Sequence, residues 1–265
     1  MTRGPVAICY GTRPQVIKAS MLIEASEARW PLLTLDTGQH YDYKLNEVFY
    51  EQLGVERPDH FLEVGSGAHA VQTSAVLTRA AAVFEAARPR AVVVIGDTNS
   101  TLGCALAAVQ MRIPLVHVEA GLRADDRGMA EEINRRMVDA VSELLCAPSA
   151  AAVARLELEH QPGTIEFTGD IAYDVLRKNL SKARPPAGEP GWPLPAGTPY
   201  AIATLHRAEL TAKPEVLEAT VASLRSLPIP IVFPVHPRVS AAMAALGLTS
   251  GGMLHVMPPL GYFEM

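Results

Sequence analysis

Charged residues follow several apolar runs of the sequence, at the points where the runs end. Arg13 and Lys18 come after the first run, Asp97 comes after a later one, and Glu119 directly follows the next. Cations at the start of a helix suit a phosphate-bearing ligand, whereas carboxylates suit proton transfer. Each residue also has a structural interpretation: an ordinary strand-to-helix turn for the two cations, and a helix cap for Asp97.

Further acids and arginines lie close by. A carboxylate such as Glu119 is costly to bury alone at the end of an apolar strand, and Arg123 is a candidate structural partner. In the segment 131–136 (EEINRR), each acid has an arginine four residues later. On a solvated helix surface such pairs contribute only a few tenths of a kcal/mol. By itself, the segment is therefore interpreted as a surface feature.

Histidine and arginine follow apolar runs in the second half of the chain. His206 and Arg207 follow one run and His236 another. Taken singly, each histidine is interpreted as a structural or surface residue. Ligands of open α/β sheets bind beyond the carboxyl ends of the strands, so these residues, Arg13 and the acids should border one cleft between two lobes. Cations for a pyrophosphate and acids for proton transfer fit nucleotide-sugar chemistry, but the residues alone do not choose the reaction.

The elements that must position these residues alternate between strands and helices. Near-continuous apolar runs, typical of a parallel sheet covered on both faces, predict strands at Val6–Cys9, Leu32–Leu35, Ala91–Ile95, Leu115–Val118, Leu144–Ala147 and Ile165–Phe167. Helical periodicity predicts helices at Ile17–Glu27, Ala68–Ala87, Thr101–Gln110, Glu131–Ser142 and Ser149–Glu159. Such alternation is typical of a doubly wound α/β sheet.

A stretch rich in proline and glycine, Pro185–Pro199, interrupts this alternation. We therefore predict an N-terminal Rossmann-like lobe over residues 1–182, a linker over 183–199 and a partial C-terminal Rossmann-like lobe over 200–265. Elements expected in the second lobe are strands Tyr200–Thr204, Ile229–Val235 and Leu254–Met257, and helices Pro214–Leu224 and Ser240–Leu246. This is fewer than a full doubly wound lobe usually holds.

Composition narrows the class of protein. Among 265 residues, 23 Lys and Arg against 28 Asp and Glu give a formal net charge of −5, which argues against broad binding of nucleic acid or anionic membranes. The sequence has no apolar run of transmembrane length and no start typical of an export signal. Three widely spaced cysteines in apolar surroundings are typical of reduced thiols in a cytoplasmic protein.

Eight collinear motifs resemble one known family. They are Gly-Thr-Arg-Pro-x-x-x-Lys (11–18), Asp-Thr-Gly-Gln-His (36–40), Gly-Asp-Thr (96–98), His-Val-Glu-Ala-Gly-Leu-Arg (117–123), Glu-Glu-Ile-Asn-Arg (131–135), Thr-Gly-Asp (168–170), His-Arg-x-Glu (206–209) and Pro-Val-His-Pro (234–237). Together they resemble the non-hydrolysing UDP-N-acetylglucosamine 2-epimerases. The resemblance runs from Ala7 to the last residues.

The resemblance implies a glycosyltransferase-B-like fold with two Rossmann-type lobes and a UDP-sugar between them. It implies reversible epimerisation of UDP-N-acetylglucosamine to UDP-N-acetylmannosamine at C2, by elimination of UDP to 2-acetamidoglucal and re-addition. It implies no NAD and no required metal, and a cytoplasmic homodimer whose substrate can also act as an allosteric activator.

The resemblance also implies roles for individual residues. Proton transfer is expected from Asp97 and Glu131, with Glu119 stabilising the cationic transition state or helping as acid or base. The rest of the catalytic set is Lys18, Arg135 and His206. Contacts with UDP and sugar are expected from Arg13, Gln39, His40, Arg207, His236, Tyr262 and Phe263, with Arg13 and His206 at the phosphates and the last two residues in a loop that flanks the uracil.

Departures from the family pattern leave alternatives open. Gln15 stands where Glu is common, Ala130 where Pro is usual, and Leu210 where Asn or Ser is frequent. Members of the family continue past the position of Met265 with a Ser-Gly-Gly-x-x-Glu-Glu segment that holds the phosphates and ribose. We therefore expect a piece of a longer protein, and weak or no epimerase activity without a complementing segment.

Three alternatives have different products. A hydrolysing relative would release N-acetylmannosamine and UDP, and a non-catalytic UDP-sugar-binding protein would leave C2 untouched. A glycosyltransferase fits the acid-rich motifs less well.

Overall fold

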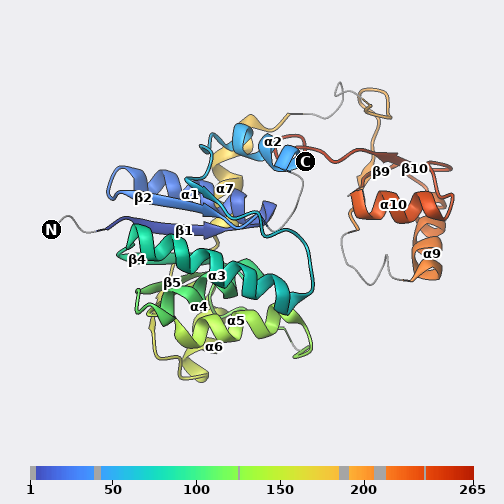
Figure 1. The fold of residues 1–265 in the computed structure, drawn as a ribbon. Helices are drawn as coiled ribbons and strands as arrows, with labels where there is room; N and C mark the ends of the chain where they lie inside the picture. Colours follow the sequence, from blue (N-terminus) through green and yellow to red (C-terminus); the bar gives the residue numbers. More distant parts are fainter. Residues whose placement is uncertain (1–3, 39–42, 125, 185–190, 206–212, 236) are drawn as a thin grey trace. The chain divides into compact units, whose positions relative to one another are not determined.

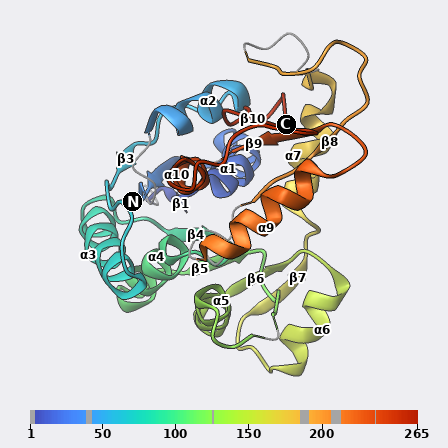
Figure 2. The ribbon, with the colours of Figure 1, turned by 90° about the vertical axis from the view of Figure 1, so that its right-hand side faces the viewer.

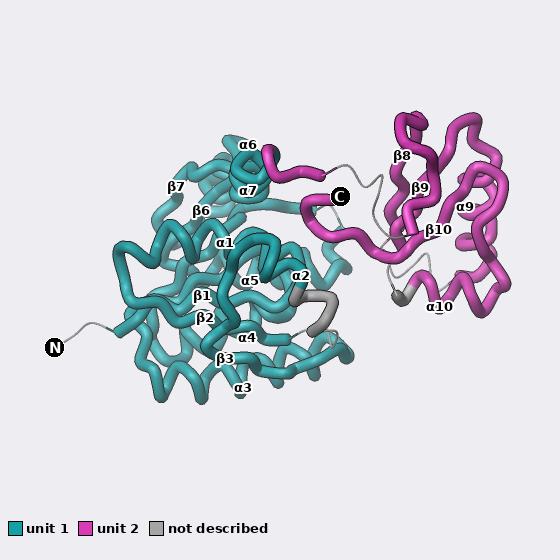
Figure 3. Tube along the Cα trace, turned by 90° about the horizontal axis from the view of Figure 1, so that it is seen from above, with its two compact units in different colours: residues 1–180 teal, residues 181–265 magenta. Residues whose placement is uncertain are grey.

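The structure is a computed structural model that describes residues 4–38, 43–124, 126–184, 191–205, 213–235 and 237–265. It divides into two compact units, Met1–Leu180 and Ser181–Met265, drawn in teal and magenta in Figure 3. No helix in these described ranges combines the length and the apolar character needed to cross a membrane.

Unit 1 is built on a parallel seven-stranded sheet with the order β3-β2-β1-β4-β5-β6-β7. The strands are β1 (Val6–Tyr10), β2 (Leu32–Asp36), β3 (His60–Phe61), β4 (Ala91–Ile95), β5 (Leu115–Val118), β6 (Leu144–Ala147) and β7 (Thr164–Phe167). This is the strand order of a Rossmann-type doubly wound sheet. All six strands predicted in this region are confirmed, and only the short β3 escaped prediction.

Six helices connect the described strands of unit 1, and a seventh follows β7. They are α1 (Arg13–Glu27), α2 (Tyr43–Leu53), α3 (His69–Ala87), α4 (Asn99–Gln110), α5 (Ala130–Val141), α6 (Ala150–Leu158) and α7 (Ile171–Asn179). A short 3-10 turn at Leu180–Lys182 follows α7 and spans the boundary between the two units. Helices α1 and α4 begin four and two residues earlier than predicted, because their N-cap residues lie upstream. Thr12 precedes α1, whose first turn contains Pro14, and the Thr98 side chain accepts a hydrogen bond from the Thr101 amide of α4.

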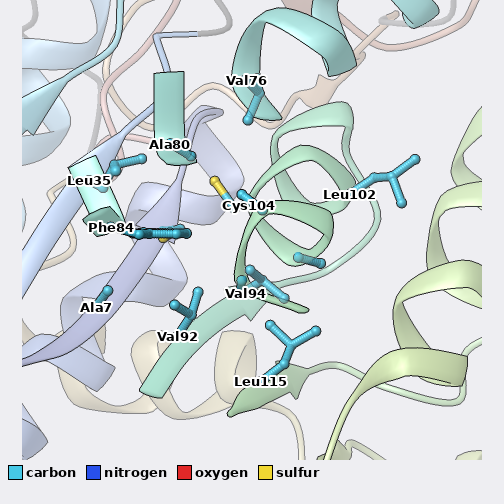
Figure 4. Close-up of a cluster of buried hydrophobic side chains, with 14 of the residues drawn as sticks. Ala7, Leu35, Val76, Ala80, Phe84, Val92, Val94, Leu102, Cys104 and Leu115 are labelled. Carbon is cyan, nitrogen blue, oxygen red and sulfur yellow. The ribbon is translucent and has the colours of Figure 1, made fainter. Parts of the chain in front are cut away.

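Helices cover both faces of the sheet (Figure 1). Helices α1, α2 and α7 lie on one face and α3 to α6 on the other, where α3 and α4 run side by side (Figure 2). Alternate residues of β4 point to opposite faces of the sheet. Val92 and Val94 pack with Phe84 of α3 (Figure 4), while Ile95 packs with Val16 of α1. Such a two-sided core explains why the strands are continuous apolar runs rather than alternating ones.

Unit 2 contains a parallel three-stranded sheet in the order β10-β9-β8. Its elements are β8 (Ala201–Ile202), α9 (Pro214–Arg225), β9 (Ile231–Pro234), α10 (Pro237–Ala245) and β10 (Leu254–Met257). Helix α10 begins three residues before the predicted start. Leu217 and Val221 of α9, Phe233 of β9 and Met243 of α10 share one core. The unit therefore has the strand–helix alternation predicted for it.

Candidate functional site

The carboxyl ends of β1, β4 and β5 lie next to one another, because β1 pairs with β4 and β4 with β5. In register, Cys9 is opposite Val94, and Ile95 is opposite Val118. The chain therefore leaves three neighbouring strands at one edge of the sheet. Arg13, Asp97 and Glu119 all follow these ends, as predicted.

The loop after β1 places two cations at the start of α1. Arg13 is the first residue of the helix, is half-buried, and lies over the ring of Phe49 with its guanidinium carbon 5.9 Å from the ring centre. Lys18 follows more than one turn later. No acidic residue occupies the first turn of α1, so the positive end of the helix dipole and the arginine together favour an anion.

Glu119 is paired with Lys18, and not with Arg123 as the sequence suggested. The Lys18 ammonium donates to Glu119 Oε2 at 2.6 Å, with side chains 19% and 11% exposed. The backbone of Glu119 is left-handed, with φ of 69°, a conformation that is costly for a residue with a side chain and that clusters at functional sites. Gly96 leaves room for this carboxylate, because a Cβ there would lie 3.3 Å from Glu119 Oε2.

Asp97 is paired with Arg135 of α5. Arg135 Nη2 donates to Asp97 Oδ2, and Asn134 Nδ2 donates to the Asp97 carbonyl at 2.9 Å. The Asp97 side chain remains 32% exposed, whereas that of Arg135 is 14% exposed. The capping interpretation of Asp97 is wrong, because Thr98 supplies the N-cap of α4. The carboxylate is thus oriented by a cation and still accessible.

The two acids that open α5 have opposite environments. Glu131 is exposed in the first turn, whereas Glu132 is only 1% exposed. Glu132 accepts from Arg136 Nε at 2.6 Å and from the Ala124 amide at 2.8 Å, and its Oε2 lies 3.4 Å from Arg135 Nη1. The interpretation of segment 131–136 as two solvated i,i+4 pairs is therefore wrong. Arg135 contacts Asp97 and Glu132, and Glu131 faces solvent.

Behind this edge lies a buried ion cluster that the sequence analysis missed. His117 Nδ1 is 2.6 Å from Asp139 Oδ1, His117 Nε2 is 2.7 Å from the Gly96 carbonyl, and both side chains are fully buried. Asp139 Oδ2 accepts from Arg123 Nη1 at 2.7 Å and from the Gly121 amide at 3.2 Å. The cluster therefore ties together the two loops that carry Asp97 and Glu119.

Arg123 connects this cluster to α6. Its Nη2 donates to Glu159 Oε2 at 2.5 Å and its Nε to Glu159 Oε1 at 3.0 Å. The hydrogen bond from Arg123 lowers the pKa of Glu159. A sequence signal existed for these contacts, since Glu132, Arg136 and Asp139 recur at i, i+4 and i+7 on one face of α5. Such a polar stripe on a helix that packs against the sheet indicates a buried network.

The loop after β2 begins with a buried carboxylate. Asp36 is 1% exposed and accepts from Tyr50 Oη at 2.6 Å and from the Gly38 amide at 2.8 Å. Burial raises the pKa of Asp36, although these two hydrogen bonds oppose the shift. Burial also raises the pKa of Tyr10 and of Tyr50. These contacts fix the chain just before Gln39 and His40, which lie outside the described residues.

Three of the expected site residues of the second half also lie outside the described residues: His206, Arg207 and His236. The remaining two, Tyr262 and Phe263, have ring centres 6.0 Å apart. Lys182 Nζ lies over the Phe263 ring, 5.7 Å from the ring centre. Burial raises the pKa of Tyr262. In the described ranges, the structure contains no group of three or more metal-ligating side chains close enough to hold a metal ion.

Fold and site together define a class: a Rossmann-type α/β protein whose sheet edge carries two carboxylates, each paired with a cation. Comparison with known proteins gives the family. The profile of the UDP-N-acetylglucosamine 2-epimerase family matches residues 24–265, so the chain belongs to this family. The expected α/β fold of the glycosyltransferase-B type and the expected membership of an isomerase family are thereby confirmed.

Several relatives align with almost the whole length of this chain. The UDP-2,3-diacetamido-2,3-dideoxy-D-glucuronate 2-epimerase of Pseudomonas aeruginosa is 38% identical over 96% of this chain and 72% of its own length. A UDP-N-acetylglucosamine 2-epimerase of Methanococcus maripaludis is 34% identical over 98% and 74%. The crystal structure of the Methanocaldococcus jannaschii UDP-GlcNAc 2-epimerase with UDP-GlcNAc and UDP superposes with a TM-score of 0.86 at 32% identity, covering 98% of this chain and 74% of that one.

Proposed function

We propose that the protein interconverts UDP-N-acetylglucosamine and UDP-N-acetylmannosamine by eliminating UDP and adding it back. The hydrogen at C2 is not acidic, because C2 is not adjacent to a carbonyl carbon. When the C1–O bond breaks and UDP takes the electron pair, positive charge develops at C1 and a base can remove the C2 proton. The product is 2-acetamidoglucal plus UDP. Addition of UDP at C1 and of a proton to the opposite face of C2 gives the epimer.

The two carboxylate–cation pairs at one sheet edge carry this proposal. Glu119 would stabilise positive charge at C1, and Asp97 would move a proton at C2, held in place by Arg135. Glu131 stays the second proton-transfer candidate, since its exposed carboxylate lies one turn from Arg135 on α5. Separate acids for the two faces of C2 are what an epimerisation requires.

Cations at the same edge would retain the leaving group. Arg13 and the start of α1 would bind the diphosphate, and Lys18 would add a positive charge close to Glu119. His206, which lies outside the described residues, is proposed as a further phosphate contact. A UDP that stays bound can return to C1, and the intermediate then does not escape.

The same reaction on UDP-2,3-diacetamido-2,3-dideoxy-D-glucuronate is the second candidate. The observation in its favour is the 38% identity to the Pseudomonas aeruginosa relative, compared with 34% to the Methanococcus maripaludis epimerase. Both substrates are 2-acetamido sugars linked to UDP, so the elimination chemistry is unchanged. A parallel assay with each UDP-sugar decides between them.

Incubation of each UDP-sugar in D2O, followed by proton NMR, tests the proposal. We expect slow incorporation of deuterium at C2 and formation of both epimers as UDP-sugars, with large rate losses in Asp97→Asn and Glu131→Gln. The control Glu157→Gln removes an exposed acid from α6 and should match the wild type. Accumulation of free sugar identifies the hydrolysing alternative. Absence of C2 exchange with both sugars identifies a binding protein and overturns the proposal.

We propose that the protein forms a homodimer through α5. Three apolar side chains four residues apart are solvent-exposed along this helix and its N-cap: Met129 (38%) at the N-cap, Ile133 (48%) and Met137 (43%). They lie away from the buried face that carries Glu132. Sedimentation of the wild type and of Ile133→Glu tests this, since the substitution should produce a monomer.

We propose a cytoplasmic location, where reduced thiols persist. Cys9, Cys104 and Cys146 are free cysteines, and the first two are buried. A hydrogen bond with Cys104, together with burial, raises the pKa of Cys9. A fluorescent fusion tests the location.

A further inference from the structure

Gln15 of α1 is a buried amide that joins two loops of the site. Only 3% of the Gln15 residue is exposed to solvent. On one side its Oε1 accepts from the backbone amides of Gly11 at 2.9 Å and Thr12 at 3.2 Å. On the other side its Nε2 donates to the Ile95 carbonyl at 2.6 Å, and it lies 2.9 Å from Thr101 Oγ1.

Both halves of this amide have buried partners. Amide donors face Oε1 and a carbonyl acceptor faces Nε2, so the assignment of oxygen and nitrogen follows from the partners. A carboxylate could accept from Gly11 and Thr12, but it could not donate to Ile95. An apolar side chain of the same length could do neither. Since all these groups are buried, a missing partner leaves a polar atom unsatisfied.

The contacts of Oε1 are local, whereas those of Nε2 reach across the sheet edge. Towards Thr12, Gln15 completes the capping box of α1, the helix that carries Arg13. Towards Thr98 and Thr101, Nε2 contacts both hydroxyls that cap α4, at 3.0 and 2.9 Å. Asp97 directly precedes this cap. One side chain therefore joins the start of α1 to the start of α4.

A second close approach makes this junction stiff. The hydroxyls of Thr37 and Ser100 are 2.6 Å apart and buried, and both crowd Gly11, where no Cβ would fit. The loop after β1 is thus packed against α4 by backbone as well as by Gln15.

We propose that Gln15 is a positioning residue that sets the distance between the diphosphate-binding start of α1 and the Asp97 carboxylate. This inference rests on the proposed function. Loss of the junction would leave each half of the site present but misaligned. A displacement of about 1 Å can lower the rate of an enzyme about 100-fold, whereas binding of UDP through α1 alone depends less on where Asp97 lies.

One substitution tests the junction. Gln15→Met keeps the length of the side chain and removes both the hydrogen-bond acceptor and the donor. The control Asn179→Leu removes another buried amide, whose Nδ2 donates to the Val175 carbonyl within α7. We expect Gln15→Met to lower kcat by about 10- to 100-fold and to change the Kd for UDP by less than about threefold. The control should keep the wild-type kcat.

Amide hydrogen exchange provides a readout that does not depend on activity. In Gln15→Met, segments 11–16 and 96–102 should both exchange faster, while the control leaves both unchanged. A kcat within twofold of the wild type, equal losses in kcat and in UDP affinity, or faster exchange in only one segment would overturn the proposal. If the wild type shows no C2 exchange with either sugar, the proposed function fails, and hydrogen exchange alone then decides on the junction.

Discussion

Replacement of Asp139 should destabilise unit 1 more than any exposed substitution. The carboxylate is fully buried and faces three donors: His117 Nδ1 at 2.6 Å, Arg123 Nη1 at 2.7 Å and the Gly121 amide at 3.2 Å. Asp139→Ala removes the acceptor of His117 Nδ1 and of the Gly121 amide, and one of the two carboxylates that contact Arg123, which costs about 3–5 kcal/mol. Asp139→Asn keeps the shape but loses the charge, for about 1.5–3 kcal/mol. Since domains are stable by about 5–15 kcal/mol, either loss is measurable.

Urea unfolding provides the assay. The chain has two tryptophans, Trp30 in unit 1 and Trp192 in unit 2, so a Trp192→Phe background makes fluorescence report on unit 1. The control is Asp126→Asn, which changes an exposed acid of the loop before α5 and should alter the free energy of unfolding by less than about 0.5 kcal/mol. A loss below about 1 kcal/mol in Asp139→Ala would contradict the assignment of a buried ion pair.

Two further predictions concern a close packing contact and a surface-proximal ion pair. Gly11→Ala should destabilise unit 1 and slow any C2 exchange, because a Cβ would overlap the hydroxyls of Thr37 and Ser100; thermal unfolding checks this, and an unchanged midpoint would refute it. Glu159→Gln should lower the free energy of unfolding by about 1 kcal/mol at neutral pH. Because Arg123 lowers the pKa of Glu159 in the folded state, this stabilisation is present above the unfolded pKa of about 4.3 and is lost as the pH falls through the folded pKa. Urea titrations from about pH 7.5 to about pH 3 should therefore show the variant and the wild type converging only at the acid end, and a gap that widens in acid would be inconsistent with this sign.

The ion pairs of unit 1 divide between two tasks. Lys18–Glu119 and Arg135–Asp97 lie at the sheet edge with partial exposure, where a substrate can exchange contacts with them. His117, Asp139 and Arg123 lie behind the edge, almost without exposure. The inner group holds the Gly96 carbonyl and the Gly121 amide, which flank the two carboxylates in sequence. The buried polar side chains of the inner group therefore hold the two loops that carry Asp97 and Glu119.

Most of the fold could be predicted because buried parallel strands have a strong sequence pattern. The apolar runs at Ala91–Ile95, Leu115–Val118 and Leu144–Ala147 coincide with β4, β5 and β6. Helices α2 and α7 and the two-residue β3 were missed. Strand β3 is too short to show a period, and α7 mixes acids, arginine and apolar residues on a partly exposed surface.

The positions of the acids could be predicted, but their partners could not. Strand ends place Asp97 and Glu119 at one edge by topology alone. Pairing depends on side-chain reach across that edge, and Lys18 of α1 reaches Glu119, which lies 101 residues away in sequence in the turn after β5. Arg123, near Glu119 in sequence, instead turns towards Asp139 and Glu159. Spacing along the chain gave no information on that choice.

The most direct test of the central claim, that the C1–O bond breaks while UDP stays bound, is positional isotope exchange. UDP-N-acetylglucosamine that carries 18O in the bridge between C1 and the β-phosphorus is incubated with the protein and followed by phosphorus NMR. The account predicts that the label moves into the non-bridging β-phosphate positions at a rate comparable to or faster than formation of the epimer. Formation of the epimer with the label retained in the bridge would contradict it.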